Sequence, residues 1–281
     1  MSEQTRKAFS EKAKERVDSV SETKREPEFV VKFRKIDDHF KDSIENKYIW
    51  FATPETLNDP FDCQVDFRSA IQRIQQIQPR NQNLPFLNTF VSPLNTSKPT
   101  MVFSASKKID PIILSTLMWA HYGDNHRGLI IEYNARAIIN HANEILSTNL
   151  KFDEVKYCNN NHITNWLSRQ AATNNLHGNS FFDGWWEKAF LTKNTPWQYE
   201  KEFRIIRSAN HQTSKNFNSQ AADPKLTIPF DAINRIYFGL NTPQTYINCV
   251  SMLVRKNFPD CQFHRIFRNG NSDFGLKVKQ L

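Results

Sequence analysis

The sequence predicts an α+β fold in which helices flank a mixed, mostly antiparallel sheet. Some short segments alternate apolar and polar residues, which is typical of strands, whereas others repeat apolar residues at helical spacing. The two kinds of segment follow no regular alternating order, and this argues against a doubly wound parallel sheet. The 281 residues include 22 Phe and 6 Trp, so we expect a sizeable, aromatic-rich core.

The chain is expected to hold one folded domain behind a tail. Residues 1–28 carry few large apolar side chains and mix acidic with basic residues, so we expect a mobile charged tail there. Residues 29–281 are expected to form a single α+β domain. No internal repeat is visible in the sequence.

In the first half of this domain, short strands and helices are expected in irregular order. The first helix begins at Asp37 or Asp38, because either side chain can cap it. The expected elements are strands at 29–34, 48–53, 101–106 and 128–133, helices at 37–46, 67–78, 111–121 and 135–147, and a long loop at 78–99.

The second half is expected to be equally mixed. The dense aromatic residues between Phe181 and Trp197 are expected to pack in the core. The expected elements are an extended segment at 151–157, helices at 163–174, 181–191 and 243–258, strands at 197–206, 226–230, 233–239 and 262–267, and a polar loop at 210–223.

The strand expected at 197–206 contains two carboxylates. Glu200 and Glu202 are two residues apart, so in a strand both project from one face. Like charges on one face cost energy unless a cation, a proton or a substrate compensates them. The structural interpretation is a solvated sheet face on which Arg204 or Arg34 pairs with Glu200. The alternative interpretation is a catalytic site.

Three expected strands carry polar residues in a familiar order. Arg34 on the first strand, Ser104 and Ser106 on a middle one, and Glu200 with Glu202 on a later one resemble the signature of mono-ADP-ribosyltransferases. The resemblance implies an ADP-ribosyltransferase-like fold with NAD as substrate. It implies that Glu202 is the catalytic carboxylate, that Glu200 orients or deprotonates the acceptor, and that Arg34, Ser104 and Ser106 contact NAD.

A second group of polar residues follows the helix expected at 111–121. Tyr122 could stack on a nicotinamide or adenine ring, and His121 could donate a hydrogen bond to a phosphate or ribose. Poly-ADP-ribose polymerases carry a similar Tyr-bearing helix before a Gly-led apolar strand. The structural interpretation is that His121 caps the helix C-terminus and that Gly123 and Gly128 end the helix.

Three motifs together resemble a bacterial family known only as domain of unknown function 2971. They are LNDPFD at 57–62, MWAHY at 118–122 and WxYExExR at 197–204, and the resemblance covers residues 29–267. It implies a cytoplasmic bacterial or phage-associated protein of the kind suspected in defence or toxin systems, and it supplies no reaction. It also favours Arg34 over Lys32 as the basic position of the first strand.

The LNDPFD motif also has a structural interpretation. Asn58 and Asp59 can bond to the local backbone, Pro60 fixes the corner, and Phe61 is expected to anchor the turn in the core. Asp62 could pair with Arg34, either to position it for a ligand or to neutralise it.

Metal binding is a weaker possibility. Asp59, Asp62, His121, Asp124 and His126 could gather around a divalent metal, as in many nucleases, but their spacing is not diagnostic and we expect no metal. The four cysteines are widely separated, which favours buried thiols and a reducing cytoplasm. No apolar run is long enough to span a membrane.

The charge suggests anionic partners. The formal net charge is +8, which favours nucleic acid, nucleotides or acidic proteins. A cationic cluster near the C-terminus could contact a polyanion or be a solvated face: Arg255, Lys256, His264, Arg265, Arg268, Lys277 and Lys279. The leading hypothesis is ADP-ribose transfer from NAD to nucleic acid or protein, or NAD hydrolysis. The alternatives are a non-enzymatic nucleic-acid- or protein-binding component of a defence system and a metal-dependent nuclease.

Overall fold

The structure is a computed structural model, and it describes residues 27–80, 82–83, 100–146, 150–173, 179–208 and 223–281. The expected tail at 1–28 and the expected loops at 78–99 and 210–223 fall almost wholly outside these ranges. None of the helices in the described ranges is long and apolar enough to cross a membrane.

The main sheet has eight strands in the order β12-β11-β10-β4-β1-β3-β8-β5. Neighbouring strands are antiparallel except for β10 and β11, which the helix α10 (Gln244–Asn257) connects as a parallel crossover. The predicted α+β class with a mixed, mostly antiparallel sheet is therefore confirmed. The strands are β1 (Phe29–Arg34), β3 (Thr100–Lys107), β4 (Leu129–Asn134), β5 (Lys151–Glu154), β8 (Glu202–Ser208), β10 (Ile233–Phe238), β11 (Gln262–Arg268) and β12 (Leu276–Gln280).

One face of this sheet carries the largest apolar cluster. The helices α2 (Asp38–Glu45), α7 (Ala135–Ile145) and α10 turn their apolar residues toward it, with Phe40, Ile138 and Val250 buried against the strands. A separate two-stranded sheet, β2 (Tyr48–Trp50) with β9 (Lys225–Thr227), adds Ile49 and Leu226 to the same cluster.

The opposite face is covered by shorter elements. The helices α5 (Asp110–Ile113) and α6 (Thr116–Tyr122) pack there, and Trp119 of α6 is fully buried with its ring edge-on to Phe33 of β1. Nearby lie the 3₁₀-helices η1 (Pro54–Thr56) and η2 (Thr195–Glu200) and the parallel pair β6 (Lys156–Cys158) and β7 (Thr192–Asn194).

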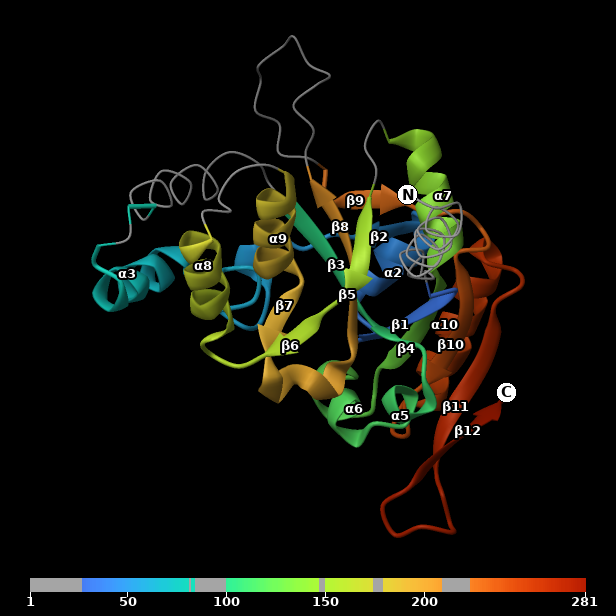
Figure 1. The fold of residues 1–281 in the computed structure, drawn as a ribbon. Coiled ribbons are helices and arrows are strands. Elements are labelled where there is room, and N and C mark those ends of the chain that lie inside the picture. Colours follow the sequence, from blue (N-terminus) through green and yellow to red (C-terminus); the bar gives the residue numbers. More distant parts are fainter. Residues whose placement is uncertain (1–26, 81, 84–99, 147–149, 174–178, 209–222) are drawn as a thin grey trace, which may run out of the picture.

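Three further helices form a separate apolar cluster at the side of the molecule. Figure 1 shows α3 (Phe67–Ile77), α8 (His162–Ala172) and α9 (Asn179–Phe190) grouped away from α10 and β10–β12. Their core is aromatic, with Trp185 stacked on Phe67 and Trp166 stacked on Phe181. Since the buried residues of these three helices form a cluster distinct from the main core, we call α3, α8 and α9 the outer helical layer.

Several expected elements differ from the structure. The helix expected at 111–121 is two helices, because the Ser115 side chain accepts a hydrogen bond from Met118 N and starts α6 afresh. The extended segment expected at 151–157 is divided between β5 and β6, which pair with different strands. Phe61 does not anchor its turn, because its side chain is 75% exposed. Neither β7 nor β12 was expected.

We predict that Gly128→Ala lowers the free energy of unfolding by at least about 2 kcal/mol, because a Cβ there would lie 2.2 Å from the Arg34 carbonyl oxygen. Gly270→Ala is the matched control, since a Cβ at Gly270 meets nothing within 4 Å, and it should change stability by less than about 0.5 kcal/mol. Urea unfolding of both variants measures the difference, and equal effects would contradict the close packing at Gly128.

Candidate functional site

The site begins with a row of residues across three neighbouring strands. Val31 of β1 pairs with Ser106 of β3, and Ser106 pairs with Glu202 of β8. Directly opposed residues in an antiparallel sheet share a face, so these side chains, together with those of the paired Ser104 and Arg204, lie on the face that α6 covers.

A cavity of about 210 Å³ opens over this row. Its walls come from β1, β3, β8, α6 and η2 and from the turn that contains Asn58 and Asp62. The polar groups at the wall include Ser104, Ser106, Tyr122, Glu200 and Glu202. Segments that are far apart in the sequence therefore meet at one concave surface.

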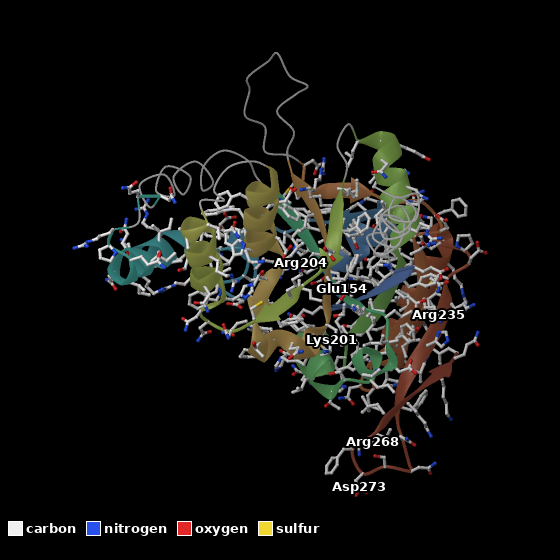
Figure 2. The ribbon with its side chains drawn as sticks, viewed as in Figure 1. Glu154, Lys201, Arg204, Arg235, Arg268 and Asp273 are labelled. Atoms are coloured by element: carbon white, nitrogen blue, oxygen red, sulfur yellow. The ribbon has the colours of Figure 1, made fainter. Side chains whose placement is uncertain are left out.

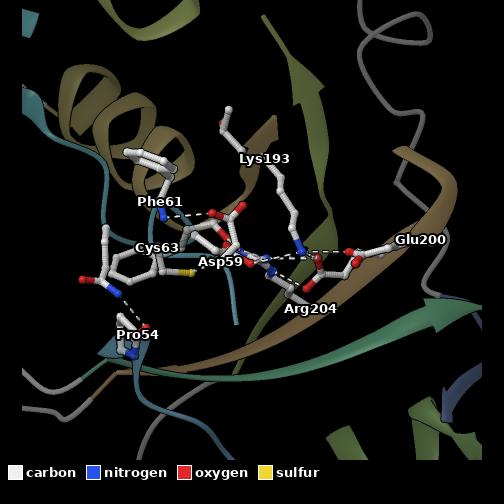
Figure 3. A network of polar contacts seen from close by, with 12 residues as sticks. Pro54, Asp59, Phe61, Cys63, Lys193, Glu200 and Arg204 are labelled. Atoms are coloured by element: carbon white, nitrogen blue, oxygen red, sulfur yellow. Dashed lines mark hydrogen bonds and ion pairs between the residues drawn. The ribbon is translucent and has the colours of Figure 1, made fainter. Parts of the chain in front are cut away.

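A buried ionic network forms one side of the cavity. The Lys193 ammonium lies 2.7 Å from Glu200 Oε2 and 3.3 Å from both Glu202 Oε2 and Asp62 Oδ2. The side chains of all three acidic residues are at most 6% exposed. Figure 3 shows the Lys193 side chain extended, with its ammonium pointing toward Glu200. One cation thus joins three acidic groups.

Arg204 is the second cation of this network. Its Nη2 donates to both oxygens of Asp62 at 2.7 Å, and its Nε donates to Glu202 Oε1 at 2.7 Å. Its Nη1 donates to the Phe190 carbonyl oxygen at 2.7 Å and lies 3.1 Å from Cys63 Sγ. The guanidinium is fully buried, and its bonds to carboxylates and to a carbonyl compensate its charge.

The prediction that Glu200 and Glu202 lie on one strand is wrong. Glu200 ends the 3₁₀-helix η2, and Lys201 adopts a left-handed conformation with φ of 46° before β8 begins at Glu202. This kink, rather than strand alternation, brings both carboxylates to Lys193. The face is buried rather than solvated, and Glu200 pairs with Lys193 instead of Arg204 or Arg34.

Left-handed residues also lie next to other groups of the site. Cys63, with φ of 56°, follows Asp62, and Asp124, Asn125 and His126 form a left-handed turn with φ of 50° to 66° soon after Tyr122. Such conformations cost non-glycine residues about 1–2 kcal/mol each. They persist because packing imposes them: the His126 ring stacks on Trp119, and His126 N donates to the Trp119 carbonyl oxygen.

Tyr122 links α6 to the ionic network. Its hydroxyl donates to Glu200 Oε1 at 2.5 Å and accepts from Asn58 Nδ2 at 3.1 Å. Burial and the neighbouring Glu200 raise the pKa of Tyr122, so the phenol stays neutral and can donate. Tyr122 therefore lies in the cavity wall, next to the carboxylates.

The two glutamates have pKa shifts of opposite sign. Burial raises the pKa of Glu200, and the bonds from Lys193 and Tyr122 only partly oppose it. Burial would also raise the pKa of Glu202, but Arg204 and Lys193 outweigh burial and lower it to about 2. Glu202 is thus a fixed negative charge, whereas Glu200 is the carboxyl that can exchange a proton closer to neutral pH.

Four further residues were predicted to contact NAD. Ser104 and Ser106 line the cavity, whereas Arg34 and His121 do not. Arg34, which pairs with Leu129 at the end of β1, is absent from the cavity wall. His121 is also outside the wall, and its Nδ1 lies 3.0 Å from the Tyr199 hydroxyl. The Ser104 hydroxyl helps to lower the pKa of Glu202, although no hydrogen bond of good geometry to its Oγ occurs within the described ranges.

Several residues of the site were not anticipated. Lys32, rather than Arg34, is the basic residue of β1 in the cavity wall. Asp62 pairs with Arg204 and Lys193 instead of Arg34. Lys193 lies outside the three sequence motifs, so no pattern indicated it. The two-residue spacing of Glu202 and Arg204, by contrast, did indicate that their side chains share one face of a strand.

The residues considered for a metal do not gather into a ligand set. In the described part of the chain, no group of three or more His, Cys, Asp or Glu side chains is arranged to hold a metal ion. Asp62 is instead bonded to Arg204. The four cysteines are all free, and burial raises the pKa of Cys63 to about 12, so that thiol is neutral.

Comparison with known proteins gives one match. Residues 118–205 match the family model DUF2971, described as a protein of unknown function. The match includes the segments that carry Tyr122, Lys193, Glu200, Glu202 and Arg204, and over this range the predicted resemblance is confirmed. No curated protein and no solved structure matches the chain.

We predict that Lys201→Gly raises the free energy of unfolding by about 1 kcal/mol, because glycine adopts a left-handed conformation without the steric penalty of a side chain. Lys256→Gly, at an exposed position of α10, should lower stability by about 1 kcal/mol. Thermal or urea unfolding distinguishes the two, and a loss at Lys201 as large as that at Lys256 would contradict the prediction.

Proposed function

We propose that this cavity cleaves the bond between nicotinamide and ribose in NAD and passes ADP-ribose to a macromolecule or to water. The observation that carries the proposal is the row from Val31 through Ser106 to Glu202, beside Glu200 and Tyr122. It supports the proposal because the Ser-bearing and Glu-bearing segments that resemble mono-ADP-ribosyltransferases border the same cavity.

The charges suit this reaction. As the glycosidic bond weakens, positive charge grows on the ribose, and a preorganised carboxylate stabilises it. Glu202 fits this role because Arg204 and Lys193 keep it ionised and fix its orientation. Glu200 fits the role of general base, because its raised pKa favours accepting a proton from the acceptor hydroxyl or water.

The volume of the cavity limits how much of an NAD molecule it can enclose. About 210 Å³ is below the roughly 300–1,000 Å³ of common ligand pockets. In the proposal, the nicotinamide and its ribose occupy the cavity, with Ser104 and Ser106 near the ribose. Arg34 has no part in binding in this proposal, since it is absent from the cavity wall. A toxin or antiviral defence role in bacteria is the biological context that we propose for this reaction.

We predict that Glu202→Gln lowers NAD cleavage at least about 100-fold, which is the usual loss when one electrostatic stabiliser of a transition state is removed. Glu154→Gln is the matched control, because Glu154 lies on β5, pairs with Lys107 of β3 and is not in the cavity wall. Release of nicotinamide reports activity, and circular dichroism confirms folding. Full activity in folded Glu202→Gln would exclude Glu202 from this role.

Tyr122→Phe tests the role of Glu200 through pH. We expect activity to rise with pH as Glu200 loses its proton, with a midpoint above the ordinary 4.5 of a glutamic acid. The Tyr122 hydroxyl bond stabilises the carboxylate, so its removal should move this midpoint to higher pH. If the midpoint of the pH dependence of kcat/KM is the same in Tyr122→Phe as in the wild type, Glu200 does not determine that midpoint.

A nucleic-acid partner has its own supporting observation. Register pairing places Arg265 with Lys279 and Phe267 with Lys277 on one face of the β11–β12 hairpin. The Phe267 ring has the Arg265 guanidinium at 5.7 Å and the Lys279 ammonium at 5.4 Å. Figure 2 shows this hairpin projecting from the body, with Arg268 and Asp273 near its tip. A cationic, partly aromatic ribbon suits a phosphate backbone.

We predict that replacing Lys277 and Lys279 together by Ala weakens binding to duplex DNA and reduces the slope of log affinity against log salt by about 2, because each phosphate contact contributes about 0.9. The control replaces Lys41 and Lys225, whose ammonium groups already pair with Asp38 and Asp42. Fluorescence anisotropy at several salt concentrations measures both, and an equal slope in the two double variants would argue against this face.

A further inference from the structure

Lys32 occupies a gap in the main sheet at the wall of the cavity. The strands β1 and β3 pair only at Val30 with Lys107 and at Val31 with Ser106. Beyond this point the Lys32 ammonium, rather than a strand, meets β3, and it donates to the Ser104 carbonyl oxygen at 2.5 Å. Both Lys32 and Ser104 are residues of the cavity wall.

The surroundings of this ammonium compensate its charge poorly. In the part of the chain that the structure describes, no carboxylate lies within 4 Å of Lys32 Nζ, which rests 4.8 Å from the centre of the Phe103 ring. Arg34 is on the same face of β1. An ammonium with one carbonyl acceptor and a nearby cation has little to gain from keeping its proton.

The protonation equilibrium agrees with this geometry. Burial, and then Arg34, lower the pKa of Lys32 to about 8, whereas Glu202 of β8 acts in the opposite direction. Tyr133 of β4 adds no charge at neutral pH, because burial raises its pKa to about 12. At a pH of about 7.5, roughly a quarter of such an amine is neutral, compared with about one in a thousand for an ordinary lysine.

We propose that Lys32 is an amine nucleophile of the cavity that condenses with small hydroxylated aldehydes and ketones, the class to which open-chain sugars belong. Desolvation in an apolar setting and a neighbouring cation are the two conditions that activate a lysine amine. The hydroxyls of Ser104 and Ser106 in the same wall suit a hydroxylated ligand. The proposal does not depend on NAD being a substrate.

The reaction balances with groups of the cavity. The neutral Lys32 nitrogen adds to the carbonyl carbon, and a proton moves from nitrogen to the former carbonyl oxygen to give a carbinolamine. The carbinolamine hydroxyl leaves as water after accepting a proton, which the acid form of Glu200 can donate because its pKa is raised. The nitrogen lone pair forms the C=N bond of a protonated imine, and addition of water reverses the sequence.

The test traps the imine on the full-length protein. Glyceraldehyde is the carbonyl probe and sodium cyanoborohydride the reductant, which converts the imine into a stable secondary amine. Peptide mass spectrometry then compares Lys32 with Lys41, an exposed lysine paired with Asp38. At a pH of about 7.5 we expect Lys32 to be modified at least about tenfold faster than Lys41, because far more of its amine is neutral.

The pH dependence provides the second measurement. The rate at Lys32 should level off soon above pH 8, whereas the rate at Lys41, whose pKa the bond to Asp38 raises, should continue to climb beyond pH 10. In Lys32→Arg, which keeps a cation but has no carbonyl-reactive amine, the fast modification should disappear. A wild-type map with Lys41 modified and Lys32 unmodified would overturn the proposal, even if the variant failed to fold.

Discussion

The site depends on the buried pairing of Arg204 with Asp62 and Glu202. Removing a guanidinium and carboxylates from water costs several kcal/mol for each ion, so the arrangement survives only because almost every polar atom finds a partner. Arg204 bonds to both acids, to the Phe190 carbonyl oxygen and to Cys63. Lys193 then adds the second cation that three carboxylates need. Removing one partner would leave the others charged and unpaired in the interior.

This pairing also explains the strained backbone around it. Asp62 is followed by the left-handed Cys63, and the left-handed Lys201 stands between the two glutamates. Neither residue is glycine, so each conformation carries a steric cost that the ion pairs must offset. In return, the chain changes direction within one residue, which places a carboxylate where a regular strand or helix could not. The local conformations and the buried charges therefore stabilise one another.

The sequence predicted regular elements well and the site only in part. Alternation identified β1, β3, β4 and β10, and the capping residues identified the starts of helices such as α2. The same alternation misplaced Glu200, because φ/ψ preferences do not reveal that Lys201 adopts a left-handed conformation. Lys193 belongs to a strand of three residues, too short to leave a periodic pattern. The sequence also did not reveal that Lys32, rather than Arg34, borders the cavity, because the gap between β1 and β3 is a tertiary feature.

The attachment of the outer helical layer has a mechanical consequence. Both ends of the Arg204 fork bond to segments that lead into this layer, since Asp62 precedes α3 and Phe190 ends α9. Trp186 and Phe190 of α9 also pack against Val102 and Ile206 of the sheet. Its aromatic cluster is distinct from the main core, so we expect the layer to open as one cooperative unit. Any such movement would pull acceptors away from a guanidinium that is fully buried. Local opening of this flank and the electrostatic state of the cavity are therefore coupled through Arg204 and Lys193, which both bond to Asp62.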